Sequence, residues 1–151
     1  MKKIFITFVL LINTILFSQE KVELNTIITL NNEICKNLIE VKFFKNDNMQ
    51  INGDYLPGKL LLDKNEFKIL KESEENISIE IIVPKLKKDE VFYNKFFIKN
   101  INFKLLLSDY FILRIYDLSC KKYKKKYYPL EGTNFTFEYD SPLETIKRAT
   151  K

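Results

Sequence analysis

The residues best suited to bind a ligand are gathered in one short segment. Five lysines fall within six consecutive positions, and tyrosines lie between and directly after them. The segment consists of Lys121, Lys122, Tyr123, Lys124, Lys125, Lys126, Tyr127 and Tyr128. Clustered ammonium groups attract polyanions, and tyrosine rings offer flat faces to sugars or bases. These eight residues are therefore candidate ligand-binding residues, with anionic polysaccharide or lipid head groups as the candidate ligands.

The same segment has a purely structural interpretation, which the pattern favours. Lysines are common on exposed edge strands, where they oppose aggregation between sheets. In a strand, Tyr123, Lys125 and Tyr127 would share one face, and that face is too mixed to be a core face. A solvated hairpin is the ordinary outcome for such a charge run. A weaker basic loop, residues 85–88, would enlarge the basic patch only if both segments lay at the same end of the fold.

Catalytic chemistry is poorly represented. The chain has no histidine and only three glycines, which excludes histidine-based nucleophile activation, histidine-ligated zinc and glycine-rich phosphate loops. Residues 119–122 match the four-residue pattern S-x-x-K, which is too short to carry weight alone. The carboxylate pairs Asp47 with Asp54 and Asp109 with Asp117 are typical of solvated turns. We therefore expect a protein that is not an enzyme and has neither a metal site nor a cofactor.

The two cysteines, Cys35 and Cys120, predict a single disulfide if the chain is exported, because an even pair in an oxidising compartment usually forms a bridge. The alternative is two separate thiols that behave as small hydrophobic side chains. The sequence alone leaves both open, because a bridge requires the two Cα atoms to approach within about 7 Å.

The N-terminus resembles a secretory signal peptide. Lys2 and Lys3 precede fourteen mostly apolar residues, 4–17, and Ser18 ends the run. The run is shorter than the roughly 20 residues of a spanning helix, so we predict cleavage after Ser18 and a periplasmic or secreted protein, with an uncleaved anchor as the alternative. No transmembrane segment is expected after cleavage. The formal charge of +5 is mild and does not require a nucleic-acid partner.

The remainder, residues 19–151, predicts one all-β domain. Eight to ten short runs rich in Ile, Val, Phe and Tyr are separated by turn residues, and this spacing favours an antiparallel β-sandwich, immunoglobulin-like, over a small barrel. The expected strands are 22–30, 38–44, 49–51, 59–62, 67–70, 77–83, 91–98, 101–107, 110–116 and 134–139.

Three local patterns in this domain carry their own expectations. Asn52-Gly53 is the strongest hairpin-turn signal. Residues 63–66 have the pattern of a helix cap, which competes with the predicted strand over 67–70. Residues 142–151 are expected to form a helical turn or a frayed tail.

Two functions remain from the sequence. The first is a non-enzymatic interaction module of the cell envelope or extracellular space, which contacts an unknown protein through a sheet edge or loop end. The second is a polyanion- or glycan-binding protein that uses residues 121–128.

Overall fold

The computed structural model describes residues 20–151, except for the short stretches 37–38, 46–48, 73–75 and 88–89. The predicted signal peptide, residues 1–18, lies outside these residues and stays a prediction. None of the helices in the described part of the chain has the length and apolar character needed to cross a lipid bilayer.

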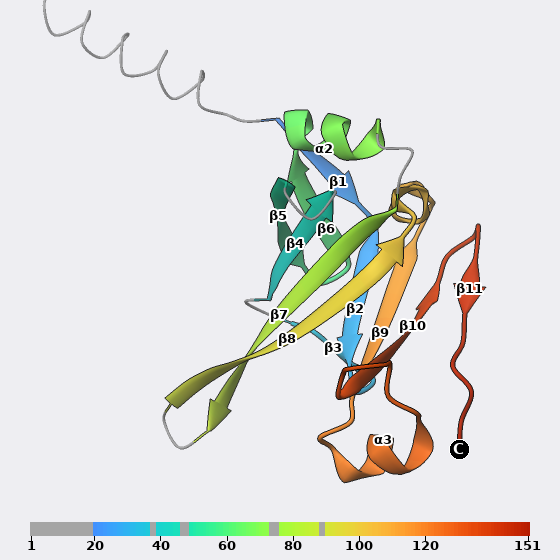
Figure 1. Ribbon diagram of the computed structural model, residues 1–151. Coiled ribbons are helices and arrows are strands. Elements are labelled where there is room, and N and C mark those ends of the chain that lie inside the picture. Colours follow the sequence, from blue (N-terminus) through green and yellow to red (C-terminus); the bar gives the residue numbers. More distant parts are fainter. Residues whose placement is uncertain (1–19, 37–38, 46–48, 73–75, 88–89) are drawn as a thin grey trace, which may run out of the picture.

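The larger sheet has six strands, all paired antiparallel. In spatial order they are β1 (Lys21–Leu24), β6 (Lys59–Asp63), β5 (Met49–Leu56), β4 (Glu40–Lys45), β7 (Ile77–Lys87) and β8 (Glu90–Ile101). Strands β1 and β8 are the two edge strands, and β7 is the sole neighbour of β8 in the described sheet. Beyond Ile82, β7 has no pairing with β4, so the far ends of β7 and β8 form a two-stranded arm (Figure 1).

The smaller sheet has five strands and contains one parallel pair. Its order is β11 (Thr145–Ile146), β10 (Phe135–Asp140), β9 (Phe111–Asp117), β2 (Thr26–Leu30) and β3 (Glu33–Ile34). Strands β2 and β9 run parallel, whereas the other neighbours are antiparallel. The expectation of a β-rich fold with antiparallel sheets is therefore confirmed. An immunoglobulin-like sandwich is not confirmed, because the two sheets are not closed.

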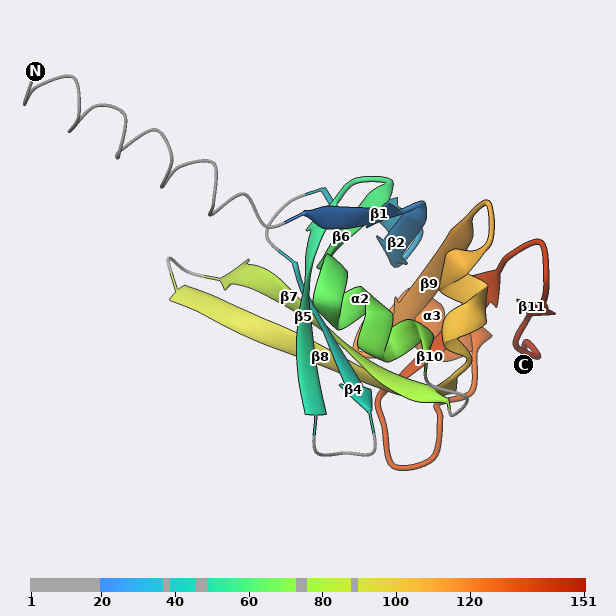
Figure 2. The same cartoon turned by 90° about the horizontal axis from the view of Figure 1, so that it is seen from above.

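A shared apolar core lies between the inner faces of the two sheets. The alternating strands point Phe43 and Ile81 inward from one sheet and Phe111 and Leu113 from the other. Two short helices add side chains at one end of this core, α2 (Lys64–Lys71) and the 3-10 helix η1 (Phe103–Leu107). Figure 2 shows α2 lying across the space between the sheets. Burial of this core is the main source of the fold's stability.

Residues 67–70 are part of helix α2, so the predicted strand there is wrong and the competing helix-cap pattern is confirmed. The Asp63 carboxylate accepts hydrogen bonds from the backbone N–H groups of Asn65 and Glu66, at 2.8 and 3.4 Å. These are N–H groups that have no partner inside the helix. The cap therefore decides the local conformation, and the helix buries Leu70 completely.

The predicted turn at Asn52-Gly53 is also wrong. Gly53 lies in the middle of β5 opposite Val41, and the chain instead turns at Pro57-Gly58, where Gly58 has a φ of 89°. Packing favours glycine at position 53, since a Cβ atom there would lie 2.8 Å from Leu60 Cδ1 and the buried Leu60 side chain would have to shift. A glycine inside a strand often marks such a close approach.

Two other predicted segments have different structures. Strand β8 ends at Ile101, and η1 replaces the predicted strand over 101–107, with the Asn102 side chain accepting from Lys104 N at 3.0 Å. Residues 142–151 are neither a helical turn nor a frayed tail. They form a turn held by the Ser141 hydroxyl, strand β11, and a bridge between Thr150 and Tyr127.

Cys35 and Cys120 are not bonded to each other in the structure, and the disulfide stays a prediction. Cys35 is buried in the shared core, whereas Cys120 is half-buried and packs against a separate cluster beneath helix α3 (Lys121–Lys126). Burial raises the pKa of the Cys35 thiol from 9.0 to about 11, opposed by a backbone hydrogen bond from Leu30.

We expect Gly53→Ala to destabilise the fold by about 1–3 kcal/mol, because the new methyl group overpacks a tight core position. Urea unfolding followed by circular dichroism would measure this. Asn52→Ala is the matched control, since its exposed side chain bonds only Gln50, and its effect should stay within about 0.5 kcal/mol. Equal stability of the two variants would contradict the packing argument.

The cysteines give a second expectation. At pH 8 a thiol reagent should label Cys120 in the folded protein and Cys35 only after unfolding, because Cys35 is buried.

Since the folded pKa of Cys35 is raised, its stabilising contribution is complete below its ordinary pKa of 9.0 and is lost as the pH rises toward 11. Cys35→Ala should remove this part of the pH dependence. An intact mass two hydrogens lower, with no reactive thiol, would show a disulfide instead.

Candidate functional site

The lysine-rich segment is a helix, α3 (Lys121–Lys126), and not the solvated hairpin favoured by the sequence pattern. Lysine has a good helix propensity, and a helix places Tyr123 and Tyr127 four residues apart on one side. Tyr127 N donates to Tyr123 O at 2.9 Å, which closes the last turn. The helix thus separates a tyrosine side from a lysine side, which a strand would have mixed.

The tyrosine side is a structural anchor. Tyr123 and Tyr127 are buried against Tyr116 on the outer face of β9, with ring centroids 5.5 and 4.4 Å from the Tyr116 ring. Of the three tyrosines predicted to stack on a ligand, only Tyr128 is available, since its side chain is 59% exposed. Aromatic packing of this kind adds about 0.5–1.5 kcal/mol per pair beyond area burial.

A turn that lies far earlier in the sequence also holds α3 in place. Asn31 and Asn32 connect β2 to β3 with φ angles of 56° and 67°, the geometry of a two-residue hairpin turn. The Tyr123 hydroxyl donates to the Asn31 carbonyl at 2.6 Å and accepts from the Asn32 amide at 3.2 Å. Sequence reasoning missed these residues, although an Asn-Asn pair between two apolar runs is a recognisable turn signal.

The Tyr116 hydroxyl is bonded as well. It donates to Glu138 Oε2 at 3.0 Å, and the other carboxylate oxygen accepts from Arg148 N at 3.1 Å. Burial, followed by hydrogen bonds with Tyr127 and Glu138, raises the pKa of Tyr116 well above its usual value. Tyr116 therefore stays uncharged even at alkaline pH, and the one carboxylate bonded to it, that of Glu138, also accepts from Arg148 N.

The lysine side is exposed and has no acidic partner. Among the described residues, no carboxylate lies within ion-pair distance of any α3 lysine. The ammonium groups of Lys122 and Lys126 lie over the rings of Tyr123 and Tyr127, at 5.4 and 4.9 Å from the centroids. These cation–π contacts orient two of the charges without neutralising them.

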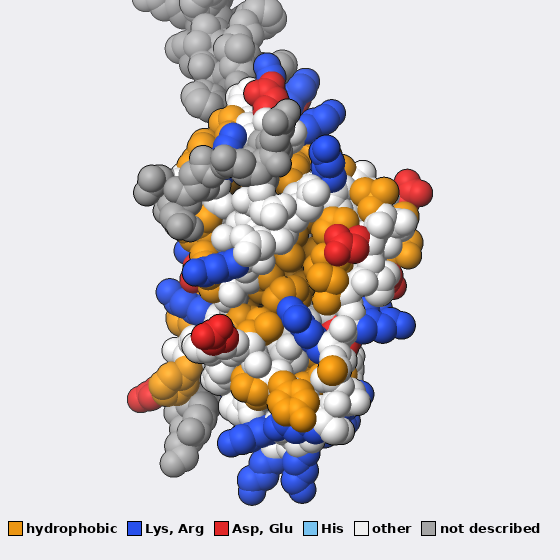
Figure 3. Space-filling view, turned by 45° about the vertical axis from the view of Figure 1, so that its right-hand side comes forward, with side chains coloured by type: hydrophobic (Ala, Val, Ile, Leu, Met, Phe, Trp, Pro, Cys, Tyr) orange, Lys and Arg blue, Asp and Glu red, His pale blue; other side chains and the backbone are white. Residues whose placement is uncertain are grey.

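A sixth lysine joins this group from the far end of the sequence. Lys151 Nζ donates to Lys124 O at 3.0 Å and lies 5.2 Å from the centroid of the Tyr128 ring. We call the six residues the α3 lysine cluster: Lys121, Lys122, Lys124, Lys125, Lys126 and Lys151. Figure 3 shows basic side chains gathered at the lower end of the molecule, where Figure 1 places α3. No local pattern could have identified Lys151, because its contact depends on the path of the chain after β10.

A second basic region lies between the edge of β8 and the loop that precedes β10. This groove of about 870 Å³ is lined by Lys95, Lys99 and Arg148, with Glu131 on its rim. Arg148 is held in place because its Nε donates to the Phe137 carbonyl at 3.1 Å and its guanidinium lies 4.9 Å from the centroid of the Phe137 ring. The groove adds positive charge near the unpaired edge of the larger sheet.

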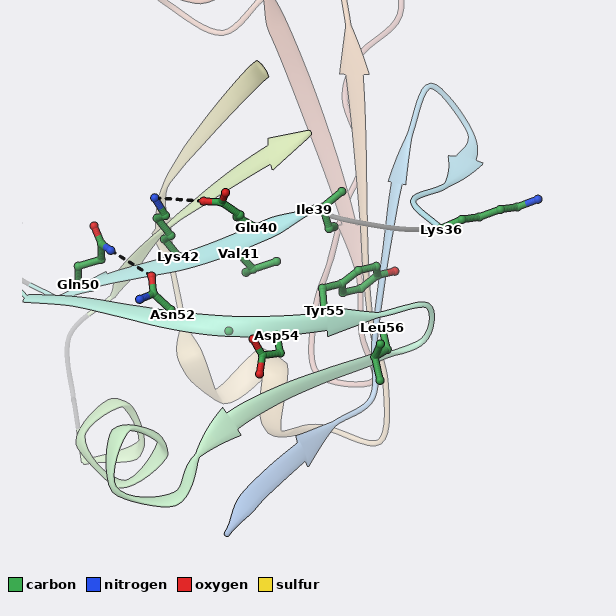
Figure 4. Close-up of a pocket in the computed structure, with 11 residues that line it drawn as sticks. Lys36, Ile39, Glu40, Val41, Lys42, Gln50, Asn52, Asp54, Tyr55 and Leu56 are labelled. Carbon is green, nitrogen blue, oxygen red and sulfur yellow. Dashed lines mark hydrogen bonds and ion pairs between the residues drawn. The ribbon is translucent and has the colours of Figure 1, made fainter. Parts of the chain in front are cut away.

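Another hollow, of about 800 Å³, lies along β4 and β5 (Figure 4). Four of its polar side chains are paired with one another, Lys42 with Glu40 in an ion pair at 3.3 Å and Gln50 with Asn52 through a hydrogen bond at 3.0 Å. Tyr55 points away from this hollow toward β2, where its hydroxyl accepts from Ile28 N. Lys36 also lines this hollow and is exposed, and a single exposed lysine is ordinarily solvated.

The structure bears on one of the two carboxylate pairs, Asp109 with Asp117, and in part on the other. Asp47 lies outside the described residues, and Asp54 is ion-paired with Lys21. Asp109 and Asp117 bracket β9 eight residues apart, which is roughly 26 Å along a strand, whereas glycosidase carboxyl groups lie within about 10 Å of each other. Asp117 is buried and accepts from Ser119 N at 2.9 Å. In the described part of the chain, no three Cys, Asp or Glu side chains are grouped as metal ligands.

The weaker basic segment, residues 85–88, belongs to the arm. Lys85 and Leu86 lie at the end of β7, while Lys88 is outside the described residues. The arm and α3 both extend toward the lower end in Figure 1, away from α2.

Comparison of the chain with protein-family models, curated proteins and solved structures found no match. The functional argument therefore depends on the geometry alone.

We expect Tyr123→Phe to destabilise the protein by about 1–2 kcal/mol, because it leaves the Asn31 carbonyl without its donor. Thermal unfolding would measure the loss, and Tyr128→Phe is the control because its ring is exposed and its hydroxyl has no hydrogen bond in the structure. If both variants had the parent stability, the hydroxyl of Tyr123 would not be part of the anchor.

Proposed function

We propose that this protein is an exported, non-enzymatic binding protein that holds anionic polymers or anionic head groups through the α3 lysine cluster. The observation that carries the proposal is the set of six exposed ammonium groups without a carboxylate partner among the described residues. Five are on a helix fixed by buried tyrosines, and the sixth, from Lys151, is bonded to that helix. Concentrated charge of one sign creates a local potential that attracts ions of the other sign.

The residue types indicate which anions would bind. Lysine ammonium groups are compact point charges without the planar fork that gives arginine its bidentate selectivity. The cluster is therefore suited to phosphate, sulfate or carboxylate groups repeated along a polymer or a surface. Recognition of individual sugar rings is less well supported, because Tyr128 is the one exposed ring of the three tyrosines.

A protein-interaction module remains the second candidate, and the edge of β8 favours it. This strand pairs only with β7 in the described sheet, so the other edge of its backbone is available to a partner strand. An interaction of this kind would depend little on salt, whereas binding through the lysine cluster would weaken steadily as salt rises. The immunoglobulin-like sandwich also stays a proposal for the scaffold.

The proposal is tested by replacing the five helical lysines with glutamine, which keeps the helix propensity and removes the charge. Binding to immobilised heparin and to inorganic polyphosphate should weaken by at least about tenfold, since each lysine near an anionic surface contributes about 1 kcal/mol. In this experiment the protein is expressed from Gln19, the predicted mature start, which keeps the whole described core because that core begins at Leu24. Isothermal titration at low and moderate salt would measure both polyanions.

A matched control has the same change in net charge away from α3. It carries glutamine at Lys36, Lys64, Lys68, Lys71 and Lys104, which are exposed. This control should bind both polyanions with close to the parent affinity. Equal weakening in the two variants would mean that net charge alone is responsible, and unchanged binding in both would contradict the proposed site.

A further inference from the structure

The arm formed by the far ends of β7 and β8 is unusual because it has apolar side chains but no core. It comprises residues 84–87 and 90–93, and in the described structure these strand ends pair only with each other. Figures 1 and 2 show the arm extending away from both sheets. An isolated two-stranded hairpin is marginally stable in water.

Four exposed side chains of the arm are large and apolar. Leu86 is 71% exposed, Tyr93 60%, Val91 54% and Phe92 47%. The register pairs Leu86 with Val91 and Pro84 with Tyr93, so these side chains share one face of the arm. An apolar stripe of this kind on a projecting element marks an interaction surface.

The charge around the stripe indicates what covers it. On the opposite face Lys85 lies beside Phe92, and Lys87 is opposite Glu90 in the register. Figure 1 shows the arm and α3 both extending toward its lower end, and Figure 2 shows them on opposite sides of the molecule. An apolar element combined with a basic cluster is the arrangement of proteins that bind the interface of an anionic bilayer. Tyrosine and phenylalanine suit this interface because their rings are apolar and the tyrosine hydroxyl can stay hydrated.

We propose that the protein binds anionic lipid bilayers, with the arm inserted at the interface while the α3 lysine cluster contacts the head groups. This inference rests on the proposed function, and it assigns the anion to a lipid surface. Two signals are needed for firm attachment, because neither a basic patch nor a small apolar contact is strong enough alone. The arm supplies the apolar contact, which binding to a soluble polyanion does not require.

The first experiment separates the arm from the lysine cluster. Leu86→Ser, Val91→Ser and Tyr93→Ser are combined, and co-sedimentation is measured with vesicles of phosphatidylcholine and phosphatidylglycerol. Vesicle binding should fall by about tenfold or more, since transfer of large apolar side chains drives interfacial binding, while heparin binding stays at the parent level. The control combines Ile34→Ser, Leu56→Ser and Leu143→Ser, which are apolar residues exposed outside the arm.

A second measurement detects insertion directly. The chain has no tryptophan, so Tyr93→Trp places a single reporter on the arm and Leu143→Trp places one outside it. Brominated acyl chains should quench the arm reporter on anionic vesicles and leave the reporter at position 143 unquenched. Vesicles of phosphatidylcholine alone should quench neither, because they lack the negative charge that the cluster requires.

The outcomes distinguish this inference from the proposed function. Parent-level vesicle binding by the serine variant, or equal quenching of the two reporters, would overturn arm insertion. If heparin binding still depended on the helical lysines, the proposed function would stand without the membrane. If the arm variant instead lost only a protein partner from an envelope extract, the arm would be a protein-docking element, which also overturns the inference. Circular dichroism of each variant confirms that the comparison is between folded proteins.

Discussion

Burial of one apolar core between the two sheets is the constraint on which the other features depend. The inner faces of the sheets meet through side chains such as Phe43 and Phe111, and α2 and η1 cover one end. Because the sheets do not close on each other, the fold retains an unpaired edge at β8 and a hairpin that extends beyond the core. These unpaired features follow from the topology, since each lies where a strand has lost its neighbour.

The smaller tyrosine cluster explains how a highly charged helix can be held against this fold. Tyr116 supplies an uncharged platform on the outer face of β9, and Tyr123 and Tyr127 pack on it. Their burial compensates for bringing several like charges together on one short helix. The lysines are consequently presented to solvent in a fixed arrangement, which lowers the ordering cost of binding an extended anionic surface.

The arm and α3 differ in the solvent property that each would use. Lysine side chains act through the electrostatic potential, which salt screens over roughly 8–10 Å. The arm acts through apolar surface removed from water, which is insensitive to such screening. Both extend toward the lower end in Figure 1 but lie on opposite sides of the molecule in Figure 2, so a partner that met both forces would have to be an extended surface.

The sequence by itself determined the β-rich class, most of the strands and the unusual concentration of lysine, because alternation and composition are local properties. For residues 121–126 the lysine composition permits a helix, and burial of Tyr123 and Tyr127 on Tyr116 in the tertiary structure favours the helix over the strand alternative. Tertiary structure decided the position of Gly53 inside β5, where close packing against Leu60 favours glycine. The contact of Lys151 with α3 and the exposure of the arm arise between residues far apart in the chain. Such contacts have no local pattern, because they depend on which faces the folded sheets leave uncovered.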